Sequence, residues 1–461
     1  MLSSLPDFLS YSGDLKVLHS QFRSVKDSFC LLLLSADVQP TDLQLGQTAW
    51  KRLCQTAEDS GADMVYADYR EMKDGEVQPH PLIDCQEGSL RDDFDFGKVA
   101  LIRCEAARQV LDGLLADLTQ ASYQFAAFYA LRLGLSRRAL PLHLRETLYT
   151  YLPHSRTDFE KEQFAYVRPD NRLLQIEMET ACTAHLKAIG AWLPERPALE
   201  SLAPDREFPV EASVVIPVRN RIRTIAEAVA SALEQKCNFP FNVIVVDNHS
   251  TDGTTQVLQE TAQKQNRSFL GLGRKPELVV LTPERDDLGI GGCWNLAVND
   301  SHCGRFAVQL DSDDLYSGPD TLQRIVDAFR QQQCAMLVGS YRICDFQKQT
   351  LPPGLIDHRE WTDANGHNNA LRVNGLGAPR AFFTPIARQI QFPDTSYGED
   401  YAMGLAICRR WKIGRIFDEL YLCRRWEDNS DASMTQEKLN RNNAYKDQLR
   451  TLELRARRQM V

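Results

Sequence analysis

Three aspartates crowd into four positions at the end of an apolar run. Residues 306–310 read Phe-Ala-Val-Gln-Leu, a run of strand length, and Asp311, Asp313 and Asp314 follow it. A buried strand of an α/β protein delivers its last residues to the crevice at the carboxyl edge of the sheet, so these carboxylates would face a ligand. A hard cation such as Mg²⁺ or Mn²⁺ would remove their mutual repulsion and could also hold a diphosphate. A solvated acidic turn that caps the following helix stays open as the alternative.

The segments before this cluster alternate between strand and helix patterns. Residues 212–218 form a continuous β-branched run typical of a buried parallel strand, and residues 224–235 follow with a helical pattern. A second strand, residues 241–246, ends in Asp247, and a third, residues 278–281, leads to a glycine-rich turn that opens a helix at 289–295. This order predicts βαβ units with right-handed crossovers.

Size and charge narrow the class of protein. A chain of 461 residues exceeds what one core usually supports, so two domains are expected. A net charge of −9 gives no general attraction to nucleic acid or anionic lipid. The amino terminus lacks a signal-peptide pattern, and the early apolar run 29–34 is too short to cross a bilayer. We expect a cytoplasmic protein without an integral membrane segment.

Cysteine and histidine usage argues against disulfide and zinc frameworks. The 12 cysteines are scattered without any Cys-x-x-Cys pair, which favours buried reduced thiols. The nine histidines show no paired metal-ligand spacing. A zinc site is therefore not expected.

Five motifs of the carboxy-terminal half together resemble the family 2 glycosyltransferases of the GT-A fold. They are Val-Val-Ile-Pro-Val-Arg-Asn at 214–220, Val-Val-Asp-Asn-His-Ser-Thr-Asp-Gly-Thr at 245–254, Leu-Gly-Ile-Gly-Gly-Cys-Trp-Asn at 288–295, Leu-Asp-Ser-Asp-Asp at 310–314 and Tyr-Gly-Glu-Asp at 397–400. Each is weak alone, but their order and spacing are specific. The resemblance covers about residues 211–430.

The resemblance implies transfer of a sugar from a nucleoside diphosphate of UDP or GDP type to an acceptor hydroxyl, with inversion at the anomeric carbon. It implies that Asp247 contacts the nucleobase, Asp311 the ribose or the metal, and Asp313 the metal, which would be Mn²⁺ or Mg²⁺. The cation would stabilise the charge that develops on the leaving diphosphate. The residues implied to bind the nucleotide sugar are Pro217, Val218, Arg219, Asp247, Asn295, Asp311, Ser312, Arg380 and Arg424.

The resemblance also implies a base on the acceptor side. Glu399 and Asp400, which start a helix after a glycine, match the family's base motif, and Asp400 is the expected base. An acidic first helical turn favoured by the helix dipole is the structural alternative.

Three positions depart from the usual family pattern. Arg219 stands where an aromatic residue usually stacks on the base, and Trp294 where an arginine is common. Residues 423–426 read Cys-Arg-Arg-Trp in place of Tyr-Arg-x-His, so a histidine that can complete the metal shell is missing. Arg424 or Arg425 could meet the diphosphate instead.

The first 155 residues repeat part of this pattern without its acids. The strands and turns at 29–36 and 63–69 resemble those at 306–313 and 335–341, and residues 82–84 repeat the Leu-Ile-Asp of 355–357. Leu34-Ser35-Ala36 stands at the position of Asp311-Ser312-Asp313, and Phe125-Ala126 at that of Glu399-Asp400. We expect a partial, degenerate copy of the GT-A fold or an unrelated accessory α/β domain. A different strand order in this segment would reject the copy.

The predicted organisation has four segments. Residues 1–155 form the accessory α/β domain, 156–209 a helical segment and a proline-rich linker, 210–434 the GT-A domain with a mostly parallel sheet, and 435–461 a helical tail. The pattern at 43–57 predicts a helix. The long loop expected at 350–369, with Trp361 and His367, is a candidate acceptor lid.

Two other functions remain as alternatives. A sugar nucleotidyltransferase would need a glycine-rich basic loop after the first strand, and residues 217–223 contain no glycine. A catalytically silent sugar-nucleotide sensor or scaffold is compatible with the altered arginine and histidine positions. The acceptor could be a glycan, a lipid-linked molecule or a small molecule, as in bacterial glycan synthesis, and a second copy of the chain is a further candidate partner.

Overall fold

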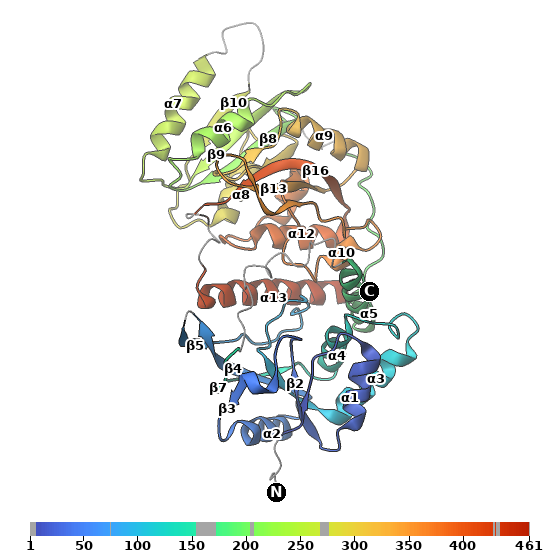
Figure 1. Ribbon diagram of the computed structural model, residues 1–461. Coiled ribbons are helices and arrows are strands. Elements are labelled where there is room, and N and C mark those ends of the chain that lie inside the picture. The colour runs from blue at the N-terminus through green and yellow to red at the C-terminus, as the bar shows by residue number, and fades with distance from the viewer. Residues whose placement is uncertain are drawn as a thin grey trace. The chain divides into compact units, whose positions relative to one another are not determined.

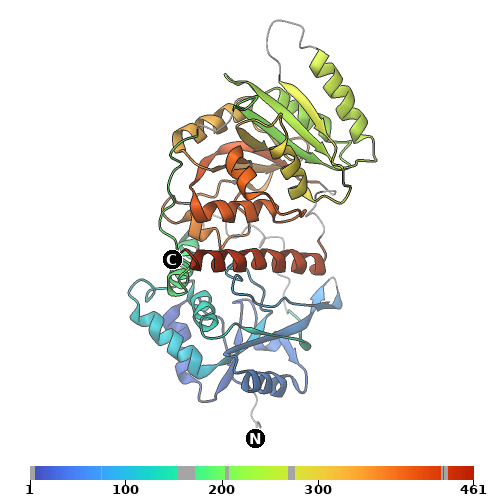
Figure 2. The ribbon, with the colours of Figure 1, turned by 180° about the vertical axis from the view of Figure 1, so that it is seen from behind.

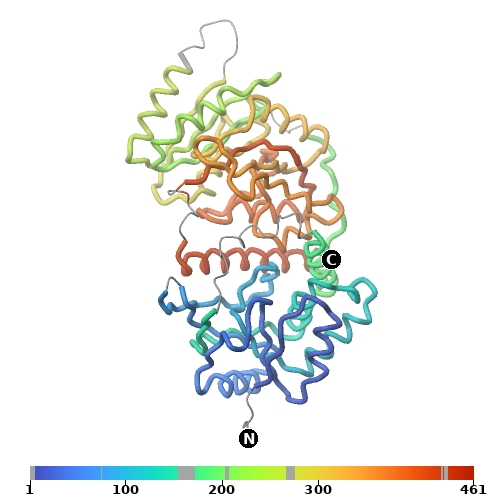
Figure 3. The backbone as a smooth tube through the Cα atoms, viewed as in Figure 1, coloured from blue at the N-terminus to red at the C-terminus, as the bar shows by residue number. Residues whose placement is uncertain are grey.

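The computed structural model describes residues 6–73, 75–153, 172–202, 207–267, 276–426, 429 and 434–460 (Figure 3). The chain forms two compact units. Unit 1 comprises residues 1–192, 371–374 and 434–461, and unit 2 comprises residues 193–370 and 375–433. Part of the predicted helical segment and linker, 154–171 and 203–206, lies outside the described residues.

The first half of unit 2 is a parallel sheet, as predicted. Its strands follow the order β10-β9-β8-β11 and all pair in parallel (Figure 1). They are β8 (Ala212–Val218), β9 (Phe241–Asp247), β10 (Glu277–Leu281) and β11 (Phe306–Gln309). Every residue of β9 and β11 is buried, which accounts for their continuous apolar sequence. Helices α6 (Ile225–Leu233), α7 (Thr254–Arg267) and α8 (Ile290–Asn299) connect them.

The second half of this sheet is mixed, so the prediction of a mostly parallel sheet holds only for the first half. Strand β15 (Arg380–Phe383) pairs antiparallel with both β11 and β13 (Met336–Cys344). Strand β16 (Ile413–Arg424) pairs parallel with β13 and antiparallel with β12 (Leu315–Tyr316). The helices of this half are α9 (Thr321–Gln332), α10 (Gly366–Asn369), α11 (Thr384–Ile390) and α12 (Glu399–Arg410).

These strand directions bring six strand ends to one edge. The carboxyl ends of β8, β9, β11, β13 and β16 and the amino end of the reversed strand β15 point the same way. Asp247, Asp311 and Arg380 therefore lie at this edge, although they are far apart in sequence. In open α/β sheets, ligands bind in the crevice outside the carboxyl ends of the strands.

The segment predicted as a long loop is largely ordered. Strand β14 (Thr350–Ile356) pairs with β13, and the segment ends in α10. Trp361 and His367 are buried, and His367 Nε2 lies 2.9 Å from the carbonyl oxygen of Leu193. The expectation of an acceptor lid built from these side chains was wrong, because both pack into unit 2.

Unit 1 contains a seven-stranded sheet of order β1-β2-β6-β4-β7-β3, with β5 paired to β4. Its strands are β1 (Phe8–Leu9), β2 (Phe29–Leu33), β3 (Leu43–Leu45), β4 (Met64–Lys73), β5 (Glu76–His80), β6 (Val99–Arg103) and β7 (Leu142–Tyr151). Its helices are α1 (Leu15–Ser24), α2 (Ala49–Ser60), α3 (Cys104–Ala116), α4 (Ala127–Ser136), α5 (Arg172–Ala188) and α13 (Gln436–Arg458), with a 3₁₀ turn at Pro40–Asp42. The helix predicted from residue 43 begins at Ala49, because Leu43–Leu45 pairs with β7.

The strand order of unit 1 repeats that of β8 and the second half of unit 2. In unit 1 the order is β1-β2-β6-β4-β7-β3, and in unit 2 it is β8-β11-β15-β13-β16-β12. Each neighbouring pair in one order has the same parallel or antiparallel direction as its counterpart in the other. The additional strand β5, which pairs with β4, corresponds to β14, which pairs with β13. Register agrees too, since Tyr69 pairs with Tyr149 as Tyr341 pairs with Tyr421. Unit 1 thus has the topology expected of a partial copy.

Helix α13 belongs to unit 1 rather than forming a separate tail, and it runs as one long helix in both views (Figures 1 and 2). Its buried face is mainly charged: Arg450 pairs with Asp447 and Arg457 with Glu453, each at 2.8 Å, and these side chains are at most 2% exposed. Gly88 lies against this helix, where a Cβ atom would come within 2.2 Å of the Thr451 backbone nitrogen.

None of these helices can cross a membrane: within the described part of the chain, no helix is both long and apolar enough to do so. All twelve cysteines are free thiols, and most are buried.

Gly88→Ala should destabilise unit 1 by about 1–3 kcal/mol, because the added methyl group overlaps backbone atoms of α13 that cannot move independently. Gly113→Ala is the matched control, since no atom lies within 4 Å of its Cβ position in α3 and alanine favours the helix by about 0.5–1 kcal/mol. Thermal unfolding of both variants measures the difference. Equal melting temperatures would contradict the packing of α13 on Gly88.

Candidate active site

Asp311 is held at the end of β11 by hydrogen bonds with two neighbours, one of which is itself bound by Tyr316. Its backbone N–H donates to the hydroxyl oxygen of Tyr421 on β16 at 3.0 Å, and its Oδ1 accepts from Nε2 of Gln309 at 2.8 Å. The Tyr316 hydroxyl donates to the carbonyl oxygen of Gln309 at 3.0 Å. Burial, with a smaller contribution from the charge of Asp313, raises the pKa of Asp311. The charge of Arg380 opposes this rise, and the hydrogen bonds fix the carboxylate in position.

Asp314 points into the protein rather than toward a ligand. It is 4% exposed, and its Oδ1 accepts the backbone N–H of Arg424 at 2.7 Å. Burial and the charges of Asp311 and Asp313 raise its pKa well above the ordinary value. Asp314 thus tethers the end of β16 to the acidic turn.

Asp313 lies beside an aromatic and cationic cluster that the sequence did not single out. Its Oδ2 accepts from Trp426 Nε1 at 3.2 Å and from Asn429 Nδ2 at 3.4 Å, and Arg221 Nε lies 3.8 Å away. The guanidinium groups of Arg223 and Arg221 lie 4.9 and 5.8 Å from the centre of the Trp426 ring. Trp426 stands where the family resemblance led us to expect a histidine. The sequence therefore drew attention to this position, but it did not predict the hydrogen bond to Asp313.

The acidic turn suits a divalent cation only together with a ligand that supplies further oxygens. Among the described residues, no three His, Cys, Asp or Glu side chains are arranged to hold a metal ion. Asp311 and Asp313 offer carboxylate oxygens, and Mg²⁺ typically takes one or two carboxylates together with substrate phosphates and water. The donor set fits a cation shared with a diphosphate.

Arg424 is buried beside this turn. Its Nε donates to the carbonyl oxygen of Asp313, its Nη1 pairs with Glu227 of α6, and its guanidinium lies 4.8 Å from the Phe346 ring centre. Its Nη2 finds no hydrogen-bond partner within the described residues. Arg424 therefore braces the turn from behind, and its contact with a nucleotide sugar stays a prediction.

The residues predicted to hold the nucleobase gather at the ends of β8 and β9. Val218 and Asp247 pair in register, Pro217 is half-buried and Arg219 is exposed. Asp247 is 1% exposed, because Oδ1 accepts the backbone N–H of Ser250 at 3.1 Å and Oδ2 accepts the Thr255 hydroxyl. The carboxylate shapes its own turn, and its contact with a nucleobase stays a prediction.

The glycine-rich turn before α8 packs against the protein. A Cβ at Gly289 would lie 2.4 Å from the backbone of Thr395, and one at Gly291 would lie 1.9 Å from the carbonyl oxygen of Pro393. Asn295 exchanges two 2.8 Å hydrogen bonds with the backbone of Phe392. These residues fix the loop that leads to α12, so Asn295 has a positioning role in the structure and its predicted nucleotide contact has no support here.

Glu399 and Asp400 form the first turn of α12, next to Arg380 of β15. Glu399 is 8% exposed, and burial, then the charge of Asp400, raises its pKa to about 8. Asp400 Oδ2 pairs with Nη1 of Arg380, and the Arg380 backbone N–H donates to Gln309 Oε1 at 3.0 Å. The structure therefore brings together Asp311, Arg380 and Asp400, which the sequence predicted separately. The polar Gln309 inside an apolar strand was the one signal for its linking role.

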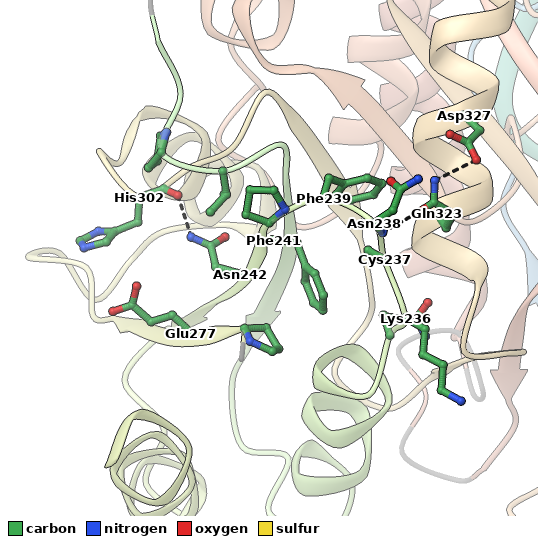
Figure 4. Close-up of a pocket in the computed structure, with 15 residues that line it drawn as sticks. Lys236, Cys237, Asn238, Phe239, Phe241, Asn242, Glu277, His302, Gln323 and Asp327 are labelled. Atoms are coloured by element: carbon green, nitrogen blue, oxygen red, sulfur yellow. Dashed lines mark hydrogen bonds between the residues drawn. The ribbon is translucent and has the colours of Figure 1, made fainter. Parts of the chain in front are cut away.

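A pocket of about 950 Å³ opens at the opposite edge of the sheet, where β8, β9 and β10 begin (Figure 4). Phe239 and Phe241 form part of its wall, and Asn242 Nδ2 donates to the carbonyl oxygen of His302 at 2.8 Å. None of the predicted site residues lines it. The predicted site residues therefore lie apart from this pocket.

Comparisons with known proteins give one family and several distant structures. Residues 213–381 match the model of Glycosyl transferase family 2. No curated protein sequence matches the chain. The match includes Asp311, Asp313 and Arg380, whereas Glu399, Asp400 and Arg424 lie beyond its end.

The structural similarities are remote. TarS of S. aureus, residues 1–349 in complex with UDP-GlcNAc, is 21% identical over 52% of this chain and 70% of its own, with a TM-score of 0.38. The mannosyltransferase PcManGT of Pyrobaculum calidifontis, in complex with GDP-Man and Mn²⁺, is 17% identical over 60% and 85%, with a TM-score of 0.36. At this distance neither structure transfers a residue role or ligand to the chain. The family match covers residues 213–381, and over this segment the chain is similar to the family 2 glycosyltransferases.

Proposed function

We propose that the chain transfers a sugar from a nucleoside diphosphate sugar to an acceptor hydroxyl, by a single displacement that inverts the anomeric carbon and depends on a divalent cation. The observation that carries the proposal is the placement of two sets of acids at one edge of one sheet. Asp311 and Asp400 are joined there through Gln309 and Arg380. The leaving diphosphate would lie on the Asp311 side and the acceptor on the Asp400 side, with the sugar between them.

The donor side needs groups that tolerate a growing negative charge on the diphosphate. Asp311 and Asp313 would hold Mg²⁺ or Mn²⁺, which when bound supplies positive charge to the leaving diphosphate. The Nε atom of Arg221 lies 3.8 Å from Oδ2 of Asp313, so its guanidinium could also meet a phosphate oxygen of the donor.

The acceptor side needs one ionised carboxylate. Glu399 is buried with a pKa of about 8, so it holds a proton near neutral pH, whereas Asp400 lies against a guanidinium that favours its ionised form. When one of two neighbouring carboxyl groups is protonated and the other is ionised, only the ionised group can act as a base. Asp400 would accept the proton of the attacking hydroxyl, and Glu399 would keep the first turn of α12 from carrying two negative charges.

Asp400→Asn should reduce turnover by about 10²–10⁴-fold, because it removes the proton acceptor, while nucleotide binding persists. Release of nucleoside diphosphate from UDP-, GDP- and dTDP-sugars with Mn²⁺ measures turnover, and thermal shift measures binding. Asp418→Asn is the control, since Asp418 is 79% exposed and pairs with Arg324 outside the site. Wild-type turnover in Asp400→Asn would reject the assignment of the base.

Asp313→Asn should abolish the extra thermal stabilisation that Mn²⁺ gives in the presence of a nucleoside diphosphate. The amide loses the charge that a hard cation requires, and stabilisation by binding follows mass action. Melting temperatures with UDP or GDP, measured with Mn²⁺ and with EDTA, provide the readout. The control Asp327→Asn removes a carboxylate that is 55% exposed and distant from the acidic turn. A metal-dependent shift that survives in Asp313→Asn would place the cation elsewhere.

Glu399→Gln should gain stability relative to the wild type as the pH rises. The folded-state pKa of Glu399 is raised to about 8, so its stabilising contribution is complete below the unfolded value of about 4.3 and is lost as pH rises through about 8. Glutamine does not titrate, so the difference in melting temperature should widen from about pH 6 to about pH 9. Calorimetry over this range would show a constant difference if Glu399 were ionised throughout.

A further inference from the structure

Arg380 is the central member of an unbroken chain of contacts across the site. Its guanidinium pairs with Asp400 through Nη1, which also donates to the carbonyl oxygen of Gly377 at 3.3 Å. Its backbone N–H donates to Gln309 Oε1 at 3.0 Å, and Gln309 Nε2 donates to Asp311 Oδ1 at 2.8 Å. The expected base and the expected metal ligand are thus fixed to the same two residues.

These contacts are arranged to position the carboxylates rather than only to neutralise them. Gln309 is 2% exposed, so its amide has little freedom to turn. The side chains of Arg380 and Asp400 are 20% and 23% exposed, so their ends remain accessible to an acceptor.

The surrounding charges show why a cation is needed at this point. Asp311, Glu399 and Asp400 all raise the pKa of Arg380, against the opposing effect of its burial, and the Tyr421 hydroxyl faces the same group. Without Arg380, two adjacent carboxyl groups would compete for one proton. The guanidinium decides this competition, since it contacts Asp400 and not the buried Glu399.

Unit 1 supplies an independent observation. In unit 1, Leu32 pairs with Ala100, next to the pair Leu31–Leu101. In unit 2, Gln309 and Arg380 lie next to the equivalent pair Val308–Ala381. Gln309 therefore corresponds to Leu32, and Arg380 to Ala100. The chain thus has leucine and alanine at these two positions, and Leu34 and Ala126 at those of Asp311 and Asp400. Unit 1 thus lacks all four of these residues, which is expected if the four act together.

We propose that Arg380 is a positioning residue that keeps Asp400 as the ionised partner of the Glu399–Asp400 pair and, through Gln309, sets its place relative to Asp311. This inference rests on the proposed function for its role in turnover. The ion pair itself can be tested without a substrate. It differs from the prediction that Arg380 contacts the acceptor, a phosphate or the nucleotide sugar.

A double-mutant cycle of thermal stability tests the ion pair. Arg380→Met should lower the melting temperature more at about pH 8.5 than at about pH 5.5, because two unshielded carboxylates are ionised together only at the higher pH. Asp400→Asn in the Arg380→Met background should relieve most of this loss. Arg330→Met, which breaks a surface ion pair with Glu211, controls for the loss of an arginine. A loss that is independent of pH and unchanged by Asp400→Asn overturns the proposal.

Turnover tests the positioning role. With UDP-, GDP- and dTDP-sugars, Mn²⁺ and water or a simple glycan as acceptor, Arg380→Met should lower kcat by on the order of 10²-fold and move the acid limb of its pH profile upward. Its thermal shift with UDP or GDP plus Mn²⁺ should match that of the wild type. Arg380→Lys should restore the pH profile more than kcat, because it returns the charge without the planar fork.

The two proposals fail in different ways. A wild type that releases no nucleoside diphosphate from any donor rejects the proposed function, while the stability cycle still decides the ion pair. If the wild type turns over and Arg380→Met has the same kcat and pH profile, the positioning role of Arg380 is rejected and the proposed function stands. If Arg380→Met weakens nucleotide binding but keeps the wild-type kcat, the positioning role is also rejected, because Arg380 then acts as a contact for the donor.

Discussion

The concentration of negative charge at the end of β11 is the constraint on which the rest of unit 2 depends. Asp311, Asp313 and Asp314 follow a fully buried strand, so none can be solvated as freely as a surface carboxylate. Each is met by a different partner: Asp311 by Gln309, Asp313 by Trp426 and Asp314 by the backbone of Arg424. The first and third partners anchor β15 and β16 to the acidic turn. A binding site built this way is prepared for positive charge before any ligand arrives.

Unit 1 has the strand order of the second half of unit 2 but lacks that constraint. The strand order and the tyrosine pair are retained, but apolar or small residues replace the acids. In place of an acidic first turn, the start of α4 receives the carboxylate of Glu177, which accepts the backbone N–H groups of residues 124–126 at 2.8–3.1 Å. The acids at the start of α12 in unit 2 thus have no counterpart at the start of α4, where a glutamate from another helix binds the turn that precedes the helix. The same framework therefore supports either chemistry or structure, depending on a few side chains.

Much of the fold was predictable because strong local patterns coincided with buried elements. The apolar runs at 212–218 and 241–246 were predicted as strands and form β8 and most of β9. The strand patterns at 63–69 and 335–341 were correctly matched with each other, since β4 and β13 occupy equivalent places in the two sheets. Strand β3 was missed because a three-residue strand has no periodicity to distinguish it from the helix that follows. The place of α13 in unit 1 was also hidden, since its buried face is formed by ion pairs and reads as a polar surface helix.

The site was predictable residue by residue but not as an arrangement. The acids at 311–314 and 399–400 have a recognisable spacing, whereas the contact between Arg380 and Asp400 depends on how β15 and α12 meet. The hydrogen bonds of Asn295 with the backbone of Phe392 were not foreseen, because a glycine-rich turn can approach either a ligand or the protein's own backbone, and here it approaches residues 392–395. Trp426 was noted only as a missing histidine, because its hydrogen bond to Asp313 depends on the fold around it.

The central claim is that the acids after β11 and the first turn of α12 flank one donor site at the carboxyl edge of the sheet. A crystal structure with Mn²⁺ and an intact or hydrolysed sugar nucleotide tests it most directly, since anomalous scattering locates the metal. We expect the manganese between Asp313 and the diphosphate, with the sugar position facing Asp400. A nucleotide seated instead in the pocket between Phe239 and His302, or a metal bound away from Asp311 and Asp313, would contradict the account.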